Sequence, residues 1–171
     1  RVASAERLDL KIIGKSSDGD KNKTRYEFNS CGHQEDIWIS EKNGGQWNLS
    51  NPISNNVNSI YNEGAPTFSA DGKYVIFVGC EFGERGDFEY GEGRTGKGSC
   101  DLFASEKEGS NWSKPFNMGA PINTGNWESQ PSFSSDGKTL YFSSKGHVSM
   151  GGYDIFKAEW NGATKNYDNV R

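Results

Sequence analysis

Two stretches of the chain have nearly the same sequence, and this internal repeat constrains the fold more than any other feature. The first covers residues 62–77 (NEGAPTFSADGKYVIF) and the second residues 126–142 (NWESQPSFSSDGKTLYF). They align without gaps at an offset of 65 residues, as from Glu63 to Glu128. The chain is therefore expected to build one structural unit more than once.

Each copy predicts a β-hairpin. A short apolar run is followed by Ser-x-Asp-Gly-Lys and then by a β-branched and aromatic run. The Asp-Gly pair supplies the positive φ angle that a tight turn between antiparallel strands needs. We interpret Asp71 and Asp136 as turn residues that bond their own backbone, rather than as a carboxylate site.

A second element recurs three times, as Asp-Ile-Trp at 36–38, Asp-Leu-Phe at 101–103 and Asp-Ile-Phe at 154–156. Together with the hairpin it gives a repeat of four predicted strands, about the length of a propeller blade. The predicted blades are a degenerate one at about 8–53, one at about 64–118 and one at about 129–160. The third has lost its tryptophan, because Lys165 stands at the position that corresponds to Trp112.

Composition agrees with an all-β domain and excludes two classes of partner. Hydrophobic residues make up only 32% of the 171 residues, aromatic residues 13%, and there are 22 glycines, which is typical of many short strands joined by turns. The net charge is −4 without a basic run, so nucleic acid is not an expected partner. No apolar stretch approaches the ~18 residues of a membrane helix. Because the chain does not begin with Met, we expect a processed chain or a fragment.

The motif x-P-x-F-S-x-D-G-K-x-x-x-F, followed by [CY]-D-[IL]-F, resembles the TolB-type β-propeller repeat, the WD40-like repeat of bacterial envelope proteins, over roughly residues 25–160. The variant with Cys100 before Asp101 is similar to copies in Bacteroidota envelope proteins that combine tetratricopeptide, propeller and OmpA-like peptidoglycan-binding domains, including components associated with type IX secretion. The resemblance implies a propeller of four-stranded antiparallel blades, periplasmic or associated with the outer membrane.

Three marked repeats fall short of the four to eight blades of a closed propeller. The propeller is therefore expected to be partial in this chain. Either unmarked strands supply another blade, or further blades come from the same precursor or from another subunit.

The middle repeat carries an insertion of about a dozen residues, because 23 residues separate Phe77 from Asp101 whereas 11 separate Phe142 from Asp154. The inserted loop is rich in glycine and charge and contains Phe82, Phe88 and Tyr90. We interpret it either as a recognition loop on a rigid scaffold or as a tolerated surface insertion.

Cys80 and Cys100 bracket this insertion. In an oxidising envelope compartment they are predicted to form a disulfide at its base. A metal site is the weaker alternative, since no CxxC or Cys/His cluster adjoins them. Cys31 is left without a partner.

Five aromatic residues recur at repeat positions and are predicted to belong to the core: Trp38, Trp47, Phe103, Trp112 and Phe156. Trp127 and Trp160 fall outside the repeated pattern. These two are therefore the better candidates for an exposed contact with a protein or a glycan.

Asp18, Asp20 and Asn22 have the oxygen spacing of a calcium loop. Lys23 occupies the position that an EF-hand gives to Gly, so a solvated polar turn is the alternative, and no other cofactor is expected. His33 and His147 lie in predicted loops without a recognisable nucleophile.

Glu63 and Glu128 could imitate the paired carboxylates of a glycosidase. Their equivalent positions in the repeat instead favour a structural role, such as a hydrogen bond between blades. The expected function is a non-catalytic protein-interaction or scaffold module in an envelope complex. Recognition of glycan or peptidoglycan fragments is the first alternative, and a propeller hydrolase is the second.

Overall fold

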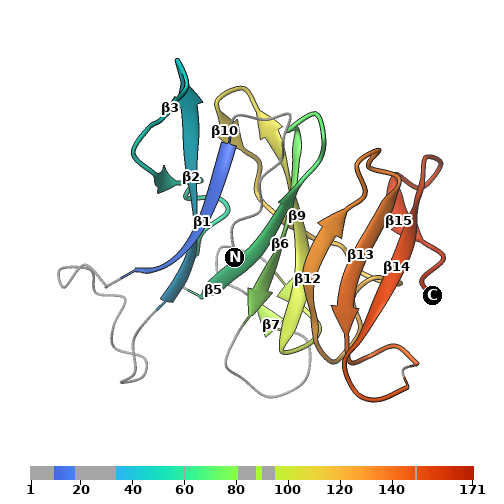
Figure 1. Ribbon diagram of the computed structural model, residues 1–171. Coiled ribbons are helices and arrows are strands. Elements are labelled where there is room, and N and C mark those ends of the chain that lie inside the picture. Colours follow the sequence, from blue (N-terminus) through green and yellow to red (C-terminus); the bar gives the residue numbers. More distant parts are fainter. Residues whose placement is uncertain (1–9, 18–33, 60, 81–87, 90–94, 149) are drawn as a thin grey trace.

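The chain is built from antiparallel β-sheets. The computed structural model describes residues 10–17, 34–59, 61–80, 88–89, 95–148 and 150–171 (Figure 1). All regular elements within these ranges are strands, so the predicted all-β class is confirmed. No helix among these residues is long and apolar enough to cross a membrane.

Three sheets follow one another in chain order. The N-terminal sheet contains β1 (Leu10–Ser17), β2 (Gln34–Asn43), β3 (Gln46–Trp47) and β4 (Asn51–Pro52). The middle sheet contains β5 (Asn62–Phe68), β6 (Tyr74–Cys80), β9 (Cys100–Glu108), β10 (Asn111–Trp112) and β11 (Phe116–Asn117). The C-terminal sheet contains β12 (Glu128–Phe133), β13 (Thr139–Ser144), β14 (Asp154–Asn161) and β15 (Asn166–Asp168). A separate hairpin pairs β7 (Phe88–Glu89) with β8 (Thr95–Gly96).

The middle sheet has five assigned strands, because its outer strand is interrupted. Both β10 and β11 pair with β9, the first at its end and the second near its centre. In the same way, β3 and β4 both pair with β2. The predicted Pro-containing fourth segment is therefore two short pieces in the first two sheets.

Both copies of the repeated hairpin form as predicted, as β5–β6 and β12–β13. Gly72 and Gly137 have φ angles of 68° and 69°. The carboxylates of Asp71 and Asp136 each accept hydrogen bonds from the serine hydroxyl two residues before and the lysine amide two residues after, at 2.6 and 3.1 Å in the first turn and 2.7 and 3.0 Å in the second. These bonds, with the serine hydroxyl as the largest cause, hold the pKa of both carboxyls below the ordinary value.

A bulge recurs in the first strand of both hairpins. The strand register shifts between Gly64 and Thr67 in β5, and at the corresponding place in β12. Ala65 and Gln130, which precede the two prolines, have φ angles of 43° and 53°. A positive φ angle is unusual for a residue other than glycine. Proline within a sheet favours a bulge, because it has no N–H to donate to the neighbouring strand.

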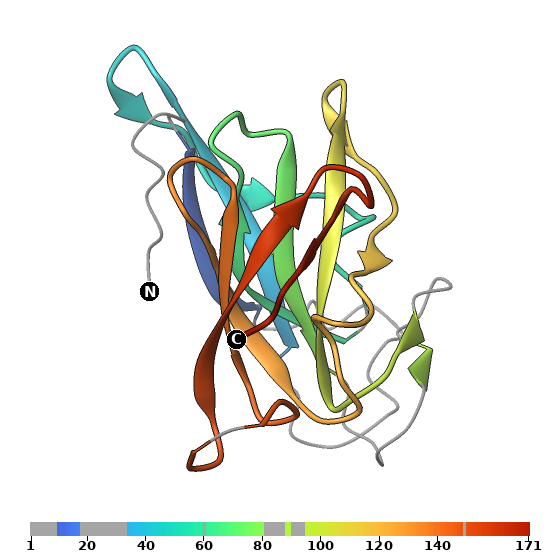
Figure 2. The same cartoon turned by 90° about the vertical axis from the view of Figure 1, so that its right-hand side faces the viewer.

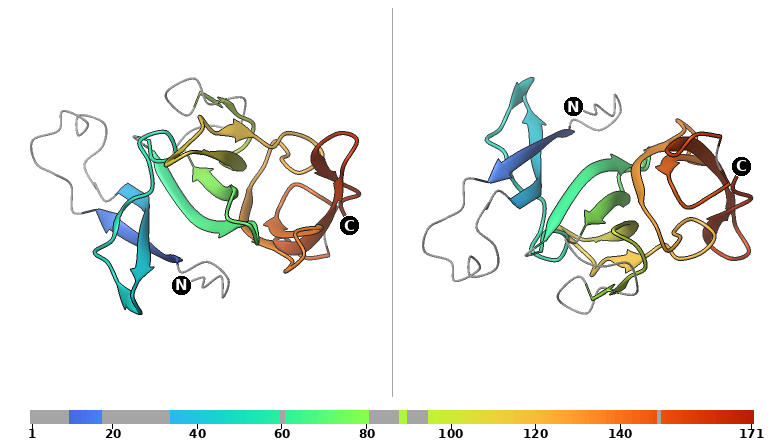
Figure 3. Two further views of the ribbon diagram at one scale, coloured as in Figure 1. Left: turned by 90° about the horizontal axis from the view of Figure 1, so that it is seen from above. Right: turned by 90° about the horizontal axis from the view of Figure 1, so that it is seen from below.

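The middle sheet is covered on both faces, as the end-on and side views show (Figures 2 and 3). One face packs against the N-terminal sheet and the other against the C-terminal sheet. The first cluster contains Ile37, Ile53, Val57, Phe68, Val75, Phe77, Phe103 and Trp112. The second contains Ile76, Val78, Cys100, Leu102, Ala104, Met118, Ile122, Leu140, Phe142, Phe156, Ala158 and Tyr167. This double burial explains the continuous apolar run of β6.

Tyr167 takes the place of the tryptophan that the third repeat lacks. It lies opposite the strand β14 at the ladder position that Trp112 occupies opposite β9, and both side chains are buried. The assignment of Lys165 to this position was wrong. The turn before β15 has four residues, whereas the turn before β10 has two. An alignment of the two repeats without gaps therefore places the residue equivalent to Trp112 two positions too early, at Lys165 instead of Tyr167.

The prediction that Trp47 belongs to the core was wrong. Its side chain is 46% exposed, although it occupies the same repeat position as Trp112 and Tyr167. Those two are buried because another sheet lies on their side, whereas the N-terminal sheet is the first of the three that the described residues form. Phe103 and Phe156 are buried as predicted, and Trp38 is half-buried.

Replacing the buried aromatic ring of the outer strand should destabilise the chain in two repeats and not in the third. Trp112→Ala and Tyr167→Ala should each lower the free energy of unfolding by about 3–5 kcal/mol, because each leaves a cavity in the core. Trp47→Ala is the matched control and should stay within about 0.5 kcal/mol of wild type. Urea denaturation of dilute protein measures the three values. A loss at Trp47 as large as that at Trp112 would contradict this assignment.

Candidate functional site

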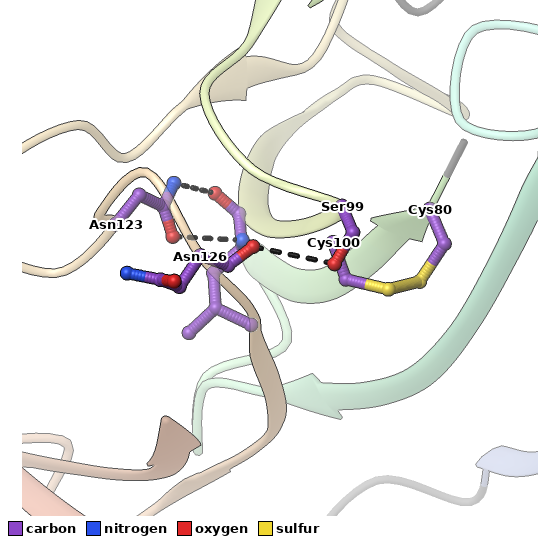
Figure 4. Close-up of a disulfide and its surroundings, with 6 residues drawn as sticks. Cys80, Ser99, Cys100, Asn123 and Asn126 are labelled. Atoms are coloured by element: carbon purple, nitrogen blue, oxygen red, sulfur yellow. Dashed lines mark hydrogen bonds between the residues drawn. A yellow bond between two sulfur atoms is a disulfide. The ribbon is translucent and has the colours of Figure 1, made fainter. Parts of the chain in front are cut away.

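A disulfide closes the base of the inserted loop. Cys80 and Cys100 face each other at the ends of β6 and β9, and their sulfur atoms are bonded at 2.04 Å (Figure 4). The predicted pairing is confirmed. Phe82 and Tyr90, predicted as contact residues, lie outside the described residues, and Phe88 is described only as part of the backbone of β7.

Just before the disulfide, the end of the insertion crosses the segment that leads into the C-terminal sheet. The amide of Ser99 donates to the carbonyl of Asn126 at 2.7 Å (Figure 4). A Cβ atom on Gly98 would lie 2.1 Å from the same carbonyl oxygen. Glycine is therefore required at residue 98, because only a residue without a side chain permits this approach.

Trp127 lies at this crossing and is half-buried rather than exposed. Its role as a contact residue stays a prediction. Its backbone bridges to Cys100, and its carbonyl accepts the amide of Lys145 at 2.9 Å. The indole packs against the core and meets the ring of Tyr153 edge-on, with centroids 4.8 Å apart. The Lys145 ammonium lies 5.4 Å from the centroid of Tyr153.

These contacts join three connecting segments at one end of the molecule, the lower end in Figures 1 and 2. We call this end the loop rim and define it as residues 95–99, 123–127, 145–148 and 150–153. Its outermost side chains are apolar, since Val148 and Met150 are fully exposed and Tyr153 is 59% exposed. Sequence reasoning missed these three residues. The one available signal was that Tyr153 occupies the motif position of Cys100.

His147 also belongs to the loop rim and has a packing role. Its Nε2 atom lies 3.1 Å from the carbonyl oxygen of Ile122. Its ring lies 5.7 Å from that of Phe142 and 5.0 Å from that of Phe156, measured between centroids. His147 thus lies in a loop, as predicted, and is half-buried.

Glu63 and Glu128 have the structural role that their repetition suggested. Both are buried. Glu128 accepts the amide and the hydroxyl of Thr124 at 2.8 and 2.7 Å and the hydroxyl of Ser144 at 2.7 Å. Glu63 accepts the amide of Ser59 at 2.9 Å and also its hydroxyl. The bonds of Glu128 lie within its own sheet and the preceding segment, so for this residue the suggested bond between blades was wrong.

Two of the three aspartates of the second repeated element, Asp101 and Asp154, close the loops that precede them. Asp101 accepts the amide of Lys97 at 2.5 Å, and Asp154 accepts the amide of Met150 at 2.7 Å. Each therefore binds the backbone four residues upstream. Asn117 donates a further bond to Asp101 at 2.7 Å.

Asp101 is the less satisfied of the two. It is completely buried, and its Oδ1 atom has no hydrogen-bond partner among the residues that the structure describes. Burial raises the pKa of this carboxyl above its ordinary value of 3.8, and the negative charge of Glu128 adds to the shift. The bonds from Lys97 and Asn117 oppose the shift.

Trp160 lies at the opposite end of the C-terminal sheet and is 44% exposed. Its role as a contact residue stays a prediction. Its ring meets that of Tyr167 at a centroid distance of 5.3 Å. It lines an open groove of about 470 Å³ together with Asp136, Lys138, Thr139 and Glu159. The groove combines an aromatic face with two carboxylates and an ammonium group.

The calcium hypothesis falls on Asp18, Asp20 and Asn22, which lie outside the described residues, as do Cys31 and His33. Within the described ranges, no group of three or more His, Cys, Asp or Glu side chains could hold a metal ion.

No family model matches the chain, and no curated protein matches it. Among solved structures it is similar to the crystal structure of TolB from Acinetobacter baumannii, with 15% sequence identity and a TM-score of 0.41. The match covers 79% of this chain and 26% of that chain, so this chain spans about a quarter of that protein's length. Function therefore has to be inferred from the residues of the chain itself.

The raised pKa of Asp101 predicts how stability depends on pH. The folded state binds the carboxyl proton of Asp101 more tightly than the unfolded state does. Protonation of Asp101 therefore contributes fully to stability below the unfolded-state pKa near 3.8. This contribution is lost as the pH rises through the folded-state pKa. We expect the stability of Asp101→Asn relative to wild type to increase as the pH rises from 3.8 through the folded-state pKa. Urea denaturation across that range measures the difference, and a difference independent of pH would contradict the prediction.

Proposed function

We propose that this chain forms three blades of a β-propeller and acts as a non-catalytic module that binds a protein partner in the bacterial envelope. The propeller is supported by three consecutive antiparallel sheets that pack face to face in chain order. The offset of 65 residues between equivalent hairpins supports repetition of one unit.

The observation that carries the proposed binding role is the exposed apolar tip of the loop rim. Exposed apolar patches on a protein surface often mark sites of interaction with another protein. Val148, Met150 and Tyr153 stand on a base that the disulfide, Trp127 and Glu128 hold in place. A fixed base lowers the entropy lost when a loop binds, so rigid display favours affinity.

The carboxylates of the repeat support a non-catalytic role. A hydrolase would need two of them to converge on a substrate with at least one free to exchange protons. Glu128 accepts hydrogen bonds from Thr124 and Ser144, and Asp71 and Asp136 are engaged in their turns. The two carboxylates that the hydrolase alternative named, Glu63 and Glu128, are both occupied by hydrogen bonds to nearby backbone and hydroxyl groups.

The disulfide favours an oxidising compartment, because cytosolic thiols are kept reduced. A periplasmic or outer-membrane location follows as part of the proposal. The association with type IX secretion or with peptidoglycan-linked assemblies rests on the repeat motif alone, in particular on the cysteine that precedes Asp101.

Charge placed at the apolar tip should abolish partner binding without unfolding the chain. We expect Val148→Asp combined with Met150→Asp to lose a protein that wild type captures from an envelope extract, because a carboxylate would have to be desolvated in the interface. The melting temperature should not change, since both side chains are fully exposed. Leu49→Asp is the matched control, at a site 89% exposed in the N-terminal sheet's connecting loop. If all variants captured the same protein as wild type, the proposed role of the loop rim would be contradicted.

Glycan binding is a second candidate function, and the groove at Trp160 favours it. Sugars bind proteins through an aromatic platform together with polar groups that bond their hydroxyls. The half-exposed indole lies beside Asp136, Lys138 and Glu159 in this way. Trp127, the other tryptophan considered for this role, is already packed against Tyr153.

Calorimetric titration with soluble peptidoglycan fragments tests the second candidate. Binding that disappears in Trp160→Ala and persists in Trp47→Ala would support it, since the two tryptophans are about equally exposed. No heat of binding with wild type, or equal binding by both variants, would exclude the Trp160 groove as a glycan site.

A further inference from the structure

The chain has two methionines, and they lie in opposite environments. Met118 is 5% exposed and belongs to the core between the middle and C-terminal sheets. Its amide donates to the carbonyl of Leu102 at 3.1 Å, and its carbonyl accepts the side-chain amide of Asn166 at 3.1 Å. Met150 is fully exposed at the tip of the loop rim. The two thioethers therefore differ in how easily a reagent in the solvent reaches them.

The chain that follows Met150 leaves room for an enzyme as well as for a small reagent. A Cβ atom on Gly151 or on Gly152 would lie more than 4 Å from every atom beyond the adjacent residues. The backbone of Met150 is nevertheless held in place, since its amide donates to the carboxylate of Asp154 at 2.7 Å. The thioether is thus presented to the solvent on an anchored segment.

Met150 also carries the only sulfur atom of the loop rim. The sulfur atoms of Cys80 and Cys100, at the strand ends beside the rim, are already oxidised to the disulfide. Thioethers are oxidised to sulfoxides under mild conditions, and the product can be reduced again by dedicated enzymes. At this end of the molecule, an oxidant therefore finds the thioether of Met150 as the readily oxidised group.

We propose that Met150 is a reversible oxidation site through which hydrogen peroxide controls binding at the loop rim. The sulfur lone pair attacks one oxygen of the peroxide, the O–O bond breaks, and the sulfoxide and one water molecule form. Sulfur loses two electrons, which the peroxide gains. A reductase with a pair of thiols restores the thioether, since the thiols become a disulfide and the oxygen leaves as water. The proposal rests on the proposed function and adds its regulation.

Oxidation would change the chemistry of the tip without changing the fold. Met150 lies between Val148 and Tyr153 in the chain, so a sulfoxide would place a strongly polar group within the exposed apolar tip. A sulfoxide oxygen that is buried in an interface loses its hydrogen bonds to water, which weakens binding when the partner offers no donor. The folded chain is unaffected, because the side chain of Met150 is fully exposed.

Treatment of the folded chain with hydrogen peroxide, followed by peptide mass mapping, tests the oxidation site. Met150 should gain one oxygen atom at least about tenfold faster than Met118, because a buried thioether reacts only when the core opens. Methionine sulfoxide reductases for both sulfoxide epimers should then remove this oxygen from the folded protein. Equal rates at the two methionines, or a sulfoxide at Met150 that the reductases leave in place, would overturn the proposal.

Capture from an envelope extract, before and after peroxide treatment and removal of the peroxide, tests the control of binding. Treatment should lower the amount of protein that wild type captures by about tenfold or more, and the reductases should restore it. Met118→Leu is the matched control and should respond like wild type, since it keeps the exposed thioether. Met150→Leu lacks that thioether, so its capture should be the same with and without peroxide.

The failure of this proposal is distinguishable from that of the proposed function. No capture by untreated wild type would contradict the binding role itself and, with it, the control of binding. Undiminished capture by wild type whose Met150 is fully converted to the sulfoxide would overturn the control alone and leave the binding role standing. A loss of capture by Met150→Leu after peroxide would assign the sensitivity to another residue and overturn the proposal.

Discussion

Apolar contact between neighbouring sheets is the interaction on which the rest of this structure depends. The middle sheet supplies it in both directions, through Phe77 and Phe103 on one face and Ile76 and Leu102 on the other. Full burial of one such side chain contributes roughly 1.5–3 kcal/mol. A chain with only 32% hydrophobic residues can therefore fold, because these residues are concentrated in the strands that two neighbours cover.

Short polar bonds within the connecting segments then fix the loops that this core projects. Each repeated carboxylate binds backbone or hydroxyl groups close to it in sequence: Asp71 and Asp136 within turns, Glu128 and Asp154 at the amide four residues upstream. Local bonds of this kind need little chain entropy to form. The carboxylates of the repeat are thus explained by the loops that they hold in place. Side chains that do not recur are therefore the better candidates for binding.

The sequence was sufficient to predict features that are local or that repeat. The hairpins, the Asp-Gly turns and the disulfide follow from residue types and spacing, and the structure contains them. It was insufficient where exposure depends on the neighbouring sheet. Trp47 and Trp112 have the same local pattern, yet within the described part of the chain only Trp112 has a neighbouring sheet packed against it. Trp127 and Tyr153 could not be paired from the sequence, because their contact joins two connecting segments whose crossing depends on Gly98.

Asp101 links the stability of the core to the geometry of the loop rim. A buried carboxylate with an unpaired oxygen destabilises the folded state, and the nearby charge of Glu128 adds to that effect. The same group holds the amide of Lys97 and the amide of the Asn117 side chain, so it fixes the chain where the insertion returns to the disulfide. A neutral side chain at this position would favour folding at neutral pH but would hold these donors less strongly. The buried carboxyl group is therefore best explained by the position of the loop that it fixes.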